Sequence, residues 1–318
     1  MAEALRIVIM ATGEIALPTL RRLIDEPGCE LAALVCQPDK PVGRHQELTP
    51  PAVKVVAARH GIPVLQPPRV KSAEAVAAIA DYAPRLVVVM AYGQIVSRQL
   101  LELPPHGCIN LHASILPRHR GAAPVHAAVL AGDRESGITA MRMDEGMDTG
   151  DILHIERLRL ARRETAGSLH DKLAALAPTA LAATLDALGH GRLTARPQRH
   201  DQASYAPKLT RESGRIDWSL DCHALDRLVR GLHPWPGAFT TMRGDRGERQ
   251  LKIHSVLPNH RAAGRPGEVI RSSPRGVTVA CGRGALLVRR LQPAGGRPMT
   301  AAAFASGHSL PPGTILGE

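Results

Sequence analysis

The sequence predicts an α/β protein in which a Rossmann-like, mainly parallel sheet is followed by a smaller C-terminal β-barrel of the OB-like kind. Three observations support this fold class. Short, almost continuously apolar runs recur in the first third of the chain, helical patterns separate them, and short strands with Gly or Pro turns follow residue 205. Continuous apolar runs are typical of parallel strands that helices cover on both faces, and their alternation with helices predicts βαβ crossovers.

The elements of the first domain follow from hydrophobic periodicity. Apolar runs predict strands at 5–11, 30–36, 85–91 and 107–111, and apolar positions three and four residues apart predict helices at 16–25, 51–60 and 72–81. More alternating runs at 137–143 and 152–158 predict later strands with one wetter face. A long helix is expected at about 164–188, and Pro178 should kink or split it.

Two domains and a linker are expected because 318 residues exceed the length of one typical domain. The α/β domain is expected at 1–189, a polar linker with Gly and Pro at 190–204, and the barrel at 205–318. Strands separated by Gly or Pro turns predict a small barrel or sandwich there, at 250–256, 267–273, 276–282 and 285–292.

Charge and composition narrow the functional classes. The formal net charge is +11, and residues 201–318 carry 17 Lys and Arg against 9 Asp and Glu. This excess indicates either a module that binds a polyanion or a generally basic protein, since the arginines are dispersed. The apolar runs are too short for a signal peptide or a membrane span. The five cysteines lack CxxC spacing, which argues against a disulfide scaffold and a structural zinc site and favours the cytoplasm.

Asn110 and His112 are the first candidates for chemistry because they end a predicted strand. They occupy alternate positions, so their side chains share one face, and ligands of doubly wound sheets bind beyond the carboxyl ends of strands. Asp148 lies in a loop between Gly146 and Gly150, from which its carboxylate can face the imidazole. These residues alone also fit a structural histidine and a carboxylate that bonds its own turn.

Several motifs resemble those of the methionyl-tRNA formyltransferase family. The segments CINLHASILPRHRGAAPV (108–125) and MDEGMDTGDIL (143–153) are similar to the signature of enzymes that use 10-formyltetrahydrofolate as formyl donor. Similar segments continue in the same order, among them VCQPDKPVGR (35–44), SYAPKLTRESGRIDWS (204–219) and LHPWPGA (232–238). The resemblance implies a cytoplasmic, monomeric enzyme of translation initiation that formylates the α-amino group of methionyl-initiator tRNA, without a metal or a membrane.

The same resemblance implies particular site residues. Asn110, His112 and Asp148 match the catalytic residues: the first two donate to the oxyanion that forms as the amine attacks, and the third supports the imidazolium. The folate pocket is implied at Tyr92, Gly93, Ser114, Ile115, Leu116 and Pro117. Lys40 and Arg44 match a loop that enters the tRNA acceptor end, and the basic C-terminal domain would bind the tRNA backbone.

Two segments depart from the family pattern. Residues 11–16 read Ala-Thr-Gly-Glu-Ile-Ala where the family usually has Gly-Thr-Pro-Asp-Phe-Ala, so Ile15 removes an aromatic contact surface from the aminoacyl site. Selectivity for methionine is left open by this change. In the tRNA loop, Glu47 stands where the family commonly has further basic residues, and it would repel phosphate.

Other interpretations share parts of this pattern. The superfamily also contains sugar-nucleotide amine formyltransferases, glycinamide formyltransferases and folate hydrolases, and the altered turn fits a non-catalytic RNA-binding relative. A serine hydrolase built on Ser114, His112 and Asp148 lacks the Gly-x-Ser-x-Gly elbow. Arg118 and Arg120 have three open roles: contact with the tRNA end, contact with the glutamate tail of the folate, or ordering of the following helix.

Overall fold

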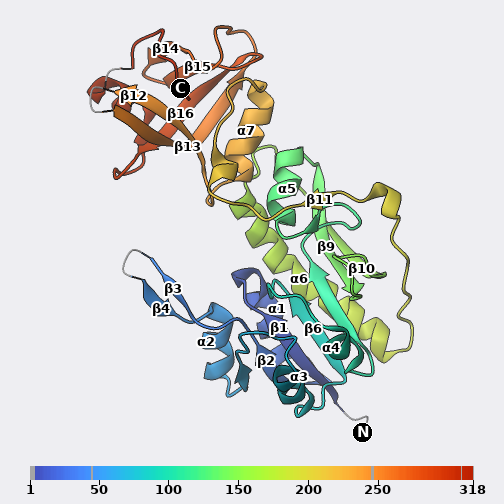
Figure 1. Cartoon of the computed structure of the whole chain (residues 1–318). Helices are drawn as coiled ribbons and strands as arrows, with labels where there is room; N and C mark the ends of the chain where they lie inside the picture. The colour runs from blue at the N-terminus through green and yellow to red at the C-terminus, as the bar shows by residue number, and fades with distance from the viewer. Residues whose placement is uncertain (1–3, 44–45, 245–246, 309, 318) are drawn as a thin grey trace. The chain divides into compact units, whose positions relative to one another are not determined.

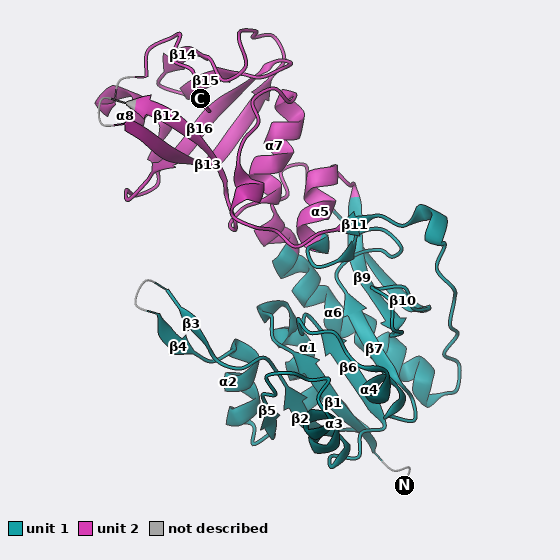
Figure 2. Ribbon diagram, viewed as in Figure 1, with its two compact units in different colours: residues 1–124, 135–159, 170–205 teal, residues 125–134, 160–169, 206–318 magenta. Residues whose placement is uncertain are grey.

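The computed structural model describes residues 4–43, 46–244, 247–308 and 310–317 (Figure 1). The chain divides into two compact units (Figure 2). Unit 1 contains residues 1–124, 135–159 and 170–205, and unit 2 contains residues 125–134, 160–169 and 206–318. Unit 2 therefore includes two short segments from the first part of the chain, and the segment 190–204 belongs to unit 1.

Unit 1 is built on a seven-stranded sheet with the strand order β10-β9-β7-β6-β1-β2-β5. Its strands are β1 (Leu5–Ala11), β2 (Cys29–Val35), β5 (Val64–Leu65), β6 (Leu86–Met90), β7 (Cys108–His112), β9 (Glu135–Arg142) and β10 (Ile152–Arg159). Strands β5, β2, β1, β6 and β7 run parallel, and β9 and β10 continue the sheet antiparallel beyond β7. The predicted mainly parallel, Rossmann-like sheet is confirmed.

Apolar side chains on both faces bury the centre of this sheet. Every residue of β1 from Ile7 to Ala11 has an exposed fraction of 0%. The helices of unit 1 are α1 (Leu17–Ile24), α2 (Ala52–Arg59), α3 (Ala73–Ala80), α4 (Arg98–Glu102) and most of α6 (Ala166–Gly189), with a short 3-10 turn at Glu14–Ala16. Of the two effects expected of Pro178, a kink or a split, the split does not occur, because α6 is continuous through that residue. Buried side chains such as Leu173 and Leu181 stabilise it against the roughly 3 kcal/mol cost of an internal proline.

Two small sheets accompany the main sheet. Strands β3 (Lys40–Val42) and β4 (Glu47–Thr49) pair antiparallel, and they are drawn in blue in Figure 1. Strand β8 (Arg120–Gly121) pairs with β11 (Tyr205–Ala206). The backbone N–H of Arg120 also donates to the carbonyl of Ser204 at 2.8 Å, so the segment before β11 returns to the turn that follows β7.

Unit 2 combines an antiparallel sheet with helices. The sheet has the order β12-β13-β16-β15-β14, and β17 pairs with β16. Its strands are β12 (Ala238–Gly244), β13 (Gly247–Asn259), β14 (Val269–Ser273), β15 (Gly276–Ala280), β16 (Ala285–Pro293) and β17 (Met299–Thr300). The helices of unit 2 include α5 (Pro124–Ala131), α7 (Cys222–Gly231) and α8 (Ala301–Gly307). Short 3-10 turns lie at His200–Gln202 in unit 1 and at Glu212–Gly214 in unit 2.

The C-terminal segment closes this sheet into a barrel. Leu316 forms a bridge with Met242 of β12, at one edge of the sheet. Ile315 forms a bridge with Glu268, directly before β14 at the other edge. The predicted C-terminal barrel is therefore present, and its edge strands are paired through residues close to the end of the chain. In the described part of the chain, no helix has the length and apolar character needed to cross a bilayer.

Candidate active site

The three predicted catalytic side chains lie together in unit 1. Asn110 and His112 are at the carboxyl end of β7, and Asp148 lies in the loop between β9 and β10. The Nδ2 atom of Asn110 is 3.4 Å from Oδ1 of Asp148, and the Nδ1 atom of His112 is 3.5 Å from Oδ2 of the same carboxylate. The fold thus brings an amide, an imidazole and a carboxylate together from segments that are 36 to 38 residues apart.

A backbone carbonyl fixes the orientation of the His112 ring. Its Nε2 atom is 2.9 Å from the carbonyl oxygen of His119, and only 6% of the residue is exposed. Because a carbonyl oxygen only accepts, Nε2 carries a proton in this arrangement. Nδ1 therefore faces the carboxylate of Asp148, the group that Asn110 also contacts.

Strong local contacts hold the carboxylate of Asp148. Its backbone has a φ of +53°, a left-handed conformation that is uncommon outside glycine, and its Oδ2 accepts the backbone N–H of Gly121 at 2.7 Å. A side chain at Gly150 would place Cβ 1.8 Å from the carbonyl oxygen of Arg142, so this position requires glycine. The carboxylate that bonds its own turn is Asp144, which accepts from the Gly146 N–H and the Thr149 hydroxyl. The side chain of Asp148 instead accepts from Gly121, outside its own turn.

Arg120 braces the loop of Asp148 from inside the protein. The residue is only 2% exposed, and its guanidinium donates to Oε1 of Gln198 at 3.2 and 2.7 Å and lies 3.1 Å from Nδ1 of His200. Gln198 in turn donates through Nε2 to the carbonyl oxygens of Asp148, at 2.9 Å, and Gly150, at 2.7 Å. This geometry therefore argues against two of the roles that the sequence leaves open for Arg120, contact with tRNA and contact with folate.

Gln198 is a residue that the sequence patterns miss. It lies 78 positions after Arg120, in the segment expected to be a linker, and no motif surrounds it. In the sequence it is one polar residue between Pro197 and Arg199. What marks it in the fold is an exposed fraction of only 5%, and exposure cannot be read from the sequence. Arg118, two positions before Arg120, is exposed.

The residues expected to line the folate pocket are unequally accessible. Ser114 is 0% exposed and its hydroxyl donates to the carbonyl of Arg118 at 2.6 Å, which argues against a nucleophilic serine. Leu116 is buried against Met141 and Ile152. Ile115 and Pro117, between and after these two, are half-buried and leave part of their surface open to a ligand.

The loop of Tyr92 and Gly93 offers backbone rather than side-chain groups. Tyr92 is 2% exposed and packs in an apolar cluster, and burial raises the pKa of its hydroxyl to about 12. Its carbonyl oxygen accepts from the Thr12 hydroxyl at 3.0 Å and from Nε2 of Gln37 at 3.3 Å. Gly93 is exposed, with a φ of +86°. This loop is therefore fixed by the turn that follows β1.

The altered turn at 11–16 is an ordered part of this framework. The backbone N–H groups of Thr12 and Gly13 donate to the carbonyl oxygen of Ala91 at 3.3 and 3.1 Å. Ile15 is 6% exposed, so its side chain is part of the core. The residue that replaces the family's aromatic therefore contributes packing to the turn and little open surface.

Lys40 lies on an exposed hairpin, β3–β4, and Arg44 falls outside the described residues. Apolar side chains are also exposed on this hairpin: Val42 is 55% and Leu48 is 70% exposed. Its base is fixed by Asp39, which accepts from Nζ of Lys54 at 2.8 Å and from Nε2 of Gln66 at 2.7 Å. The hydrogen bonds from Gln66 and Lys54 lower the pKa of Asp39.

Known proteins match this chain over nearly its whole length. Residues 5–185 match the formyl transferase family, and residues 208–309 match the formyl transferase C-terminal domain. A methionyl-tRNA formyltransferase of Geobacter metallireducens is 46% identical over 314 residues, which cover 99% of each chain.

Solved structures share the fold at low sequence identity. WlaRD, a sugar 3N-formyl transferase, has a TM-score of 0.64 at 15% identity and covers 91% of this chain and 97% of its own. HypX from Aquifex aeolicus, solved with tetrahydrofolic acid, has a TM-score of 0.62 at 16% identity and covers 96% of this chain. The match covers 47% of HypX, so this chain spans about half of that protein's length.

The structural likeness shows the fold alone, whereas 46% identity over nearly the full length shows the family. The two family matches cover both the sheet that carries Asn110, His112 and Asp148 and the C-terminal barrel. The chain belongs to the methionyl-tRNA formyltransferase family.

Proposed function

We propose that this protein transfers the formyl group of 10-formyltetrahydrofolate to the α-amino group of methionyl-initiator tRNA. The observation that carries the proposal is the convergence of Asn110, His112 and Asp148 on one site, with the amide and Nδ1 on opposite oxygens of the carboxylate. Formyl transfer to an amine needs donors for an oxyanion and an acceptor for the amine proton, and these three groups supply them.

Each side chain has a defined task in this reaction. As the neutral amine attacks the formyl carbon, a C–N bond forms and the carbonyl electron pair moves onto oxygen. The Nδ2–H of Asn110 and the Nδ1–H of the His112 imidazolium then donate to that oxygen, each donor contributing ~3 kcal/mol to the barrier reduction. Asp148 accepts the amine proton, directly or through water, and this proton returns to N10 as the bond from carbon to the folate nitrogen breaks. Tetrahydrofolate leaves, and no metal takes part.

The folate fits the exposed backbone of Gly93 and the half-buried Ile115 and Pro117 better than it fits the buried side chains beside them. A flat pterin that reads backbone donors and acceptors suits such a wall. We assign residues 1–189 to catalysis and 205–318 to tRNA binding. The segment 190–204 links them and, through Gln198, also holds the Asp148 loop. The enzyme would act as a cytoplasmic monomer in translation initiation.

One assay separates this proposal from its alternatives. The protein is incubated with 10-formyltetrahydrofolate and either methionyl-initiator tRNA or an amino-sugar nucleotide, and formyl incorporation is measured. Formylation of the tRNA alone is expected. Formylation of the amino sugar alone would replace the substrate assignment, and the absence of both products would favour the non-catalytic RNA-binding alternative.

We expect the Arg44→Ala variant to raise KM for methionyl-tRNA on the order of 10-fold, because a charged hydrogen bond to phosphate contributes about 1.5–3 kcal/mol. KM for the folate should stay near its parent value. Lys40→Ala, at the exposed start of β3, should act in the same direction. Arg59→Ala, which removes an exposed guanidinium at the end of α2, is the matched control. Equal changes in both KM values would contradict a tRNA-binding role for this loop.

A further inference from the structure

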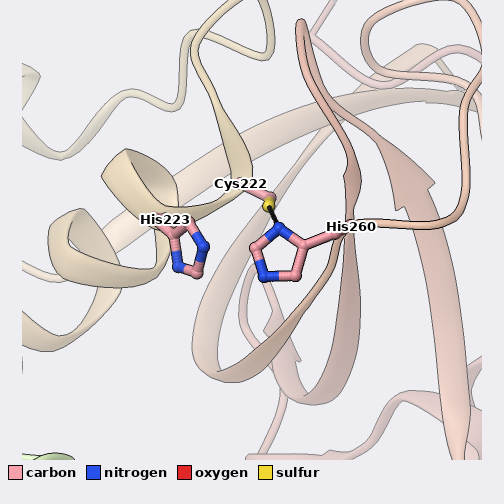
Figure 3. A group of neighbouring side chains, drawn as sticks. All are labelled: Cys222, His223 and His260. Carbon is pink, nitrogen blue, oxygen red and sulfur yellow. Dashed lines mark hydrogen bonds between the residues drawn. The ribbon is translucent and has the colours of Figure 1, made fainter.

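A cysteine and two histidines meet in unit 2, apart from the catalytic residues of unit 1 (Figure 3). Cys222 and His223 are the first two residues of α7, and His260 directly follows β13. Their possible ligand atoms all lie within 4.8 Å of one another. The Sγ of Cys222 is 4.0 Å from Nδ1 of His260, and the two imidazole ring centroids are 4.4 Å apart.

This donor set suits one class of ion. A thiolate with two imidazoles is a combination that binds zinc and its neighbours late in the first transition row, and it disfavours magnesium and calcium, which prefer oxygen. Three protein ligands leave the fourth tetrahedral position for water. The chemistry of the side chains therefore points to Zn²⁺ rather than to a hard cation.

The spacing is close to what tetrahedral zinc requires. Bonds of about 2.3 Å to sulfur and about 2.0–2.1 Å to nitrogen place the ligand atoms roughly 3.3–3.7 Å apart. Because no two of the ligand atoms are more than 4.8 Å apart, each separation must shorten by roughly 1.5 Å or less. His223 and His260 are exposed, so their rings can make this adjustment without disturbing a packed core.

The thiol is the fixed member of the group. Cys222 is 2% exposed, and its backbone N–H donates to the carbonyl oxygen of Arg283 at 3.1 Å. Asp221 caps the helix because its Oδ1 accepts the N–H groups of His223 and Ala224, at 2.7 and 3.0 Å, and its carboxylate is not part of the group of neighbouring ligand atoms. A rigid sulfur with two adjustable imidazoles is a partly formed site.

Water and ions can reach this group. His223 also lines a hollow of about 560 Å³, whose other lining residues are Arg162, Arg163, Asp226, Arg227, Arg230, Leu257 and Pro258. Four arginines make this hollow positively charged, so an ion would reach the group through the exposed imidazoles of His223 and His260 rather than through the hollow. Sequence spacing does not reveal the group, because His260 is 38 residues from Cys222 and the pair lacks a CxxC partner.

We propose that Cys222, His223 and His260 bind one Zn²⁺ ion with an exchangeable water and that this ion joins the N-terminus of α7 to the end of β13. Such a link stabilises unit 2 and takes no part in formyl transfer. The proposal is therefore independent of the reaction assigned above.

The full-length protein, freed of metal with a chelator, is dialysed against Zn²⁺, and Co²⁺ is used as a spectroscopic substitute. One tightly held zinc per chain is expected, with a thiolate-to-cobalt charge-transfer absorption. Zinc at about 100 times its Kd should raise Tm by about 5 °C. Cys222→Ser should remove the cobalt absorption, and His223→Ala and His260→Ala, both at exposed positions, should weaken zinc binding at least about 10-fold.

Matched controls separate this site from general binding by the chain's 15 histidines and 5 cysteines. Cys29→Ser removes a partly buried thiol of unit 1, and His190→Ala removes an exposed imidazole; both should bind zinc like the parent. The proposal fails if the parent binds no zinc, if Cys222→Ser retains its affinity, or if the controls lose as much as the three cluster variants.

Discussion

Formyl transfer by the His112→Ala variant is expected to be slower than that of the parent on the order of 10²-fold or more in kcat, and Asn110→Ala should cause a loss of similar size. Each substitution removes one donor to the oxyanion, a group that gains its full charge only after the amine attacks. The loss should therefore appear in kcat, measured at saturating concentrations of both substrates, with KM changed little.

The double variant tests whether the two donors act as a unit. If Asn110 and His112 serve the same oxygen, their combined loss should fall short of the product of the single losses, because residues that act together are not additive. His60→Ala, at an exposed position at the end of α2, is the control and should retain parental kcat. Turnover near the parental value in either single variant would remove the catalytic assignment.

The parts of this fold that the sequence predicts are those that depend on local pattern. Strand β1 reads as a continuous apolar run because both of its faces are buried. The predicted wetter face is present on the edge strand β10, where Arg157 and Arg159 are exposed, but it is wrong for β9, whose residues 136–141 are all buried between β7 and β10. Pro178 shows the limit of local rules: an internal proline predicts a kink or a split, and burial of the helix face around it keeps α6 continuous. Such burial depends on tertiary packing.

Contacts between distant segments are what the sequence leaves out. Asn110 and His112 could be identified because they stand two positions apart, and Asp148 because two glycines bracket it. Neither the pairing of Arg120 with Gln198 nor the meeting of His260 with Cys222 has a local signature, because each joins residues that the chain brings together only after folding. From the sequence, the two arginines of the basic turn after β7 are candidates for ligand contact, yet one of them, Arg120, is only 2% exposed.

Arg120→Met should lower both stability and turnover. The methionine fills part of the arginine's volume but leaves the buried Oε1 of Gln198 without its donor, which costs about 1–3 kcal/mol in free energy of unfolding. His200 is exposed, so water can replace the guanidinium at its Nδ1. Release of Gln198 also loosens its hold on the Asp148 loop, so kcat should fall, by on the order of 10²-fold where the carboxylate moves about 1 Å. Arg118→Met, at an exposed position in the same turn, is the control for charge.

Gln198→Glu distinguishes positioning from folding. The glutamate keeps an acceptor for the Arg120 guanidinium and adds a charge to that contact, so the buried arginine stays paired. It loses the two N–H bonds to the carbonyl oxygens of Asp148 and Gly150 and places an acceptor against them. If Arg120 and Gln198 position the carboxylate, this variant should keep most of the parental Tm and lose kcat, with KM for methionyl-tRNA unchanged. A purely structural role predicts the opposite: kcat of the folded protein would equal that of the parent, and only Tm would respond, since the reacting groups would not depend on the brace.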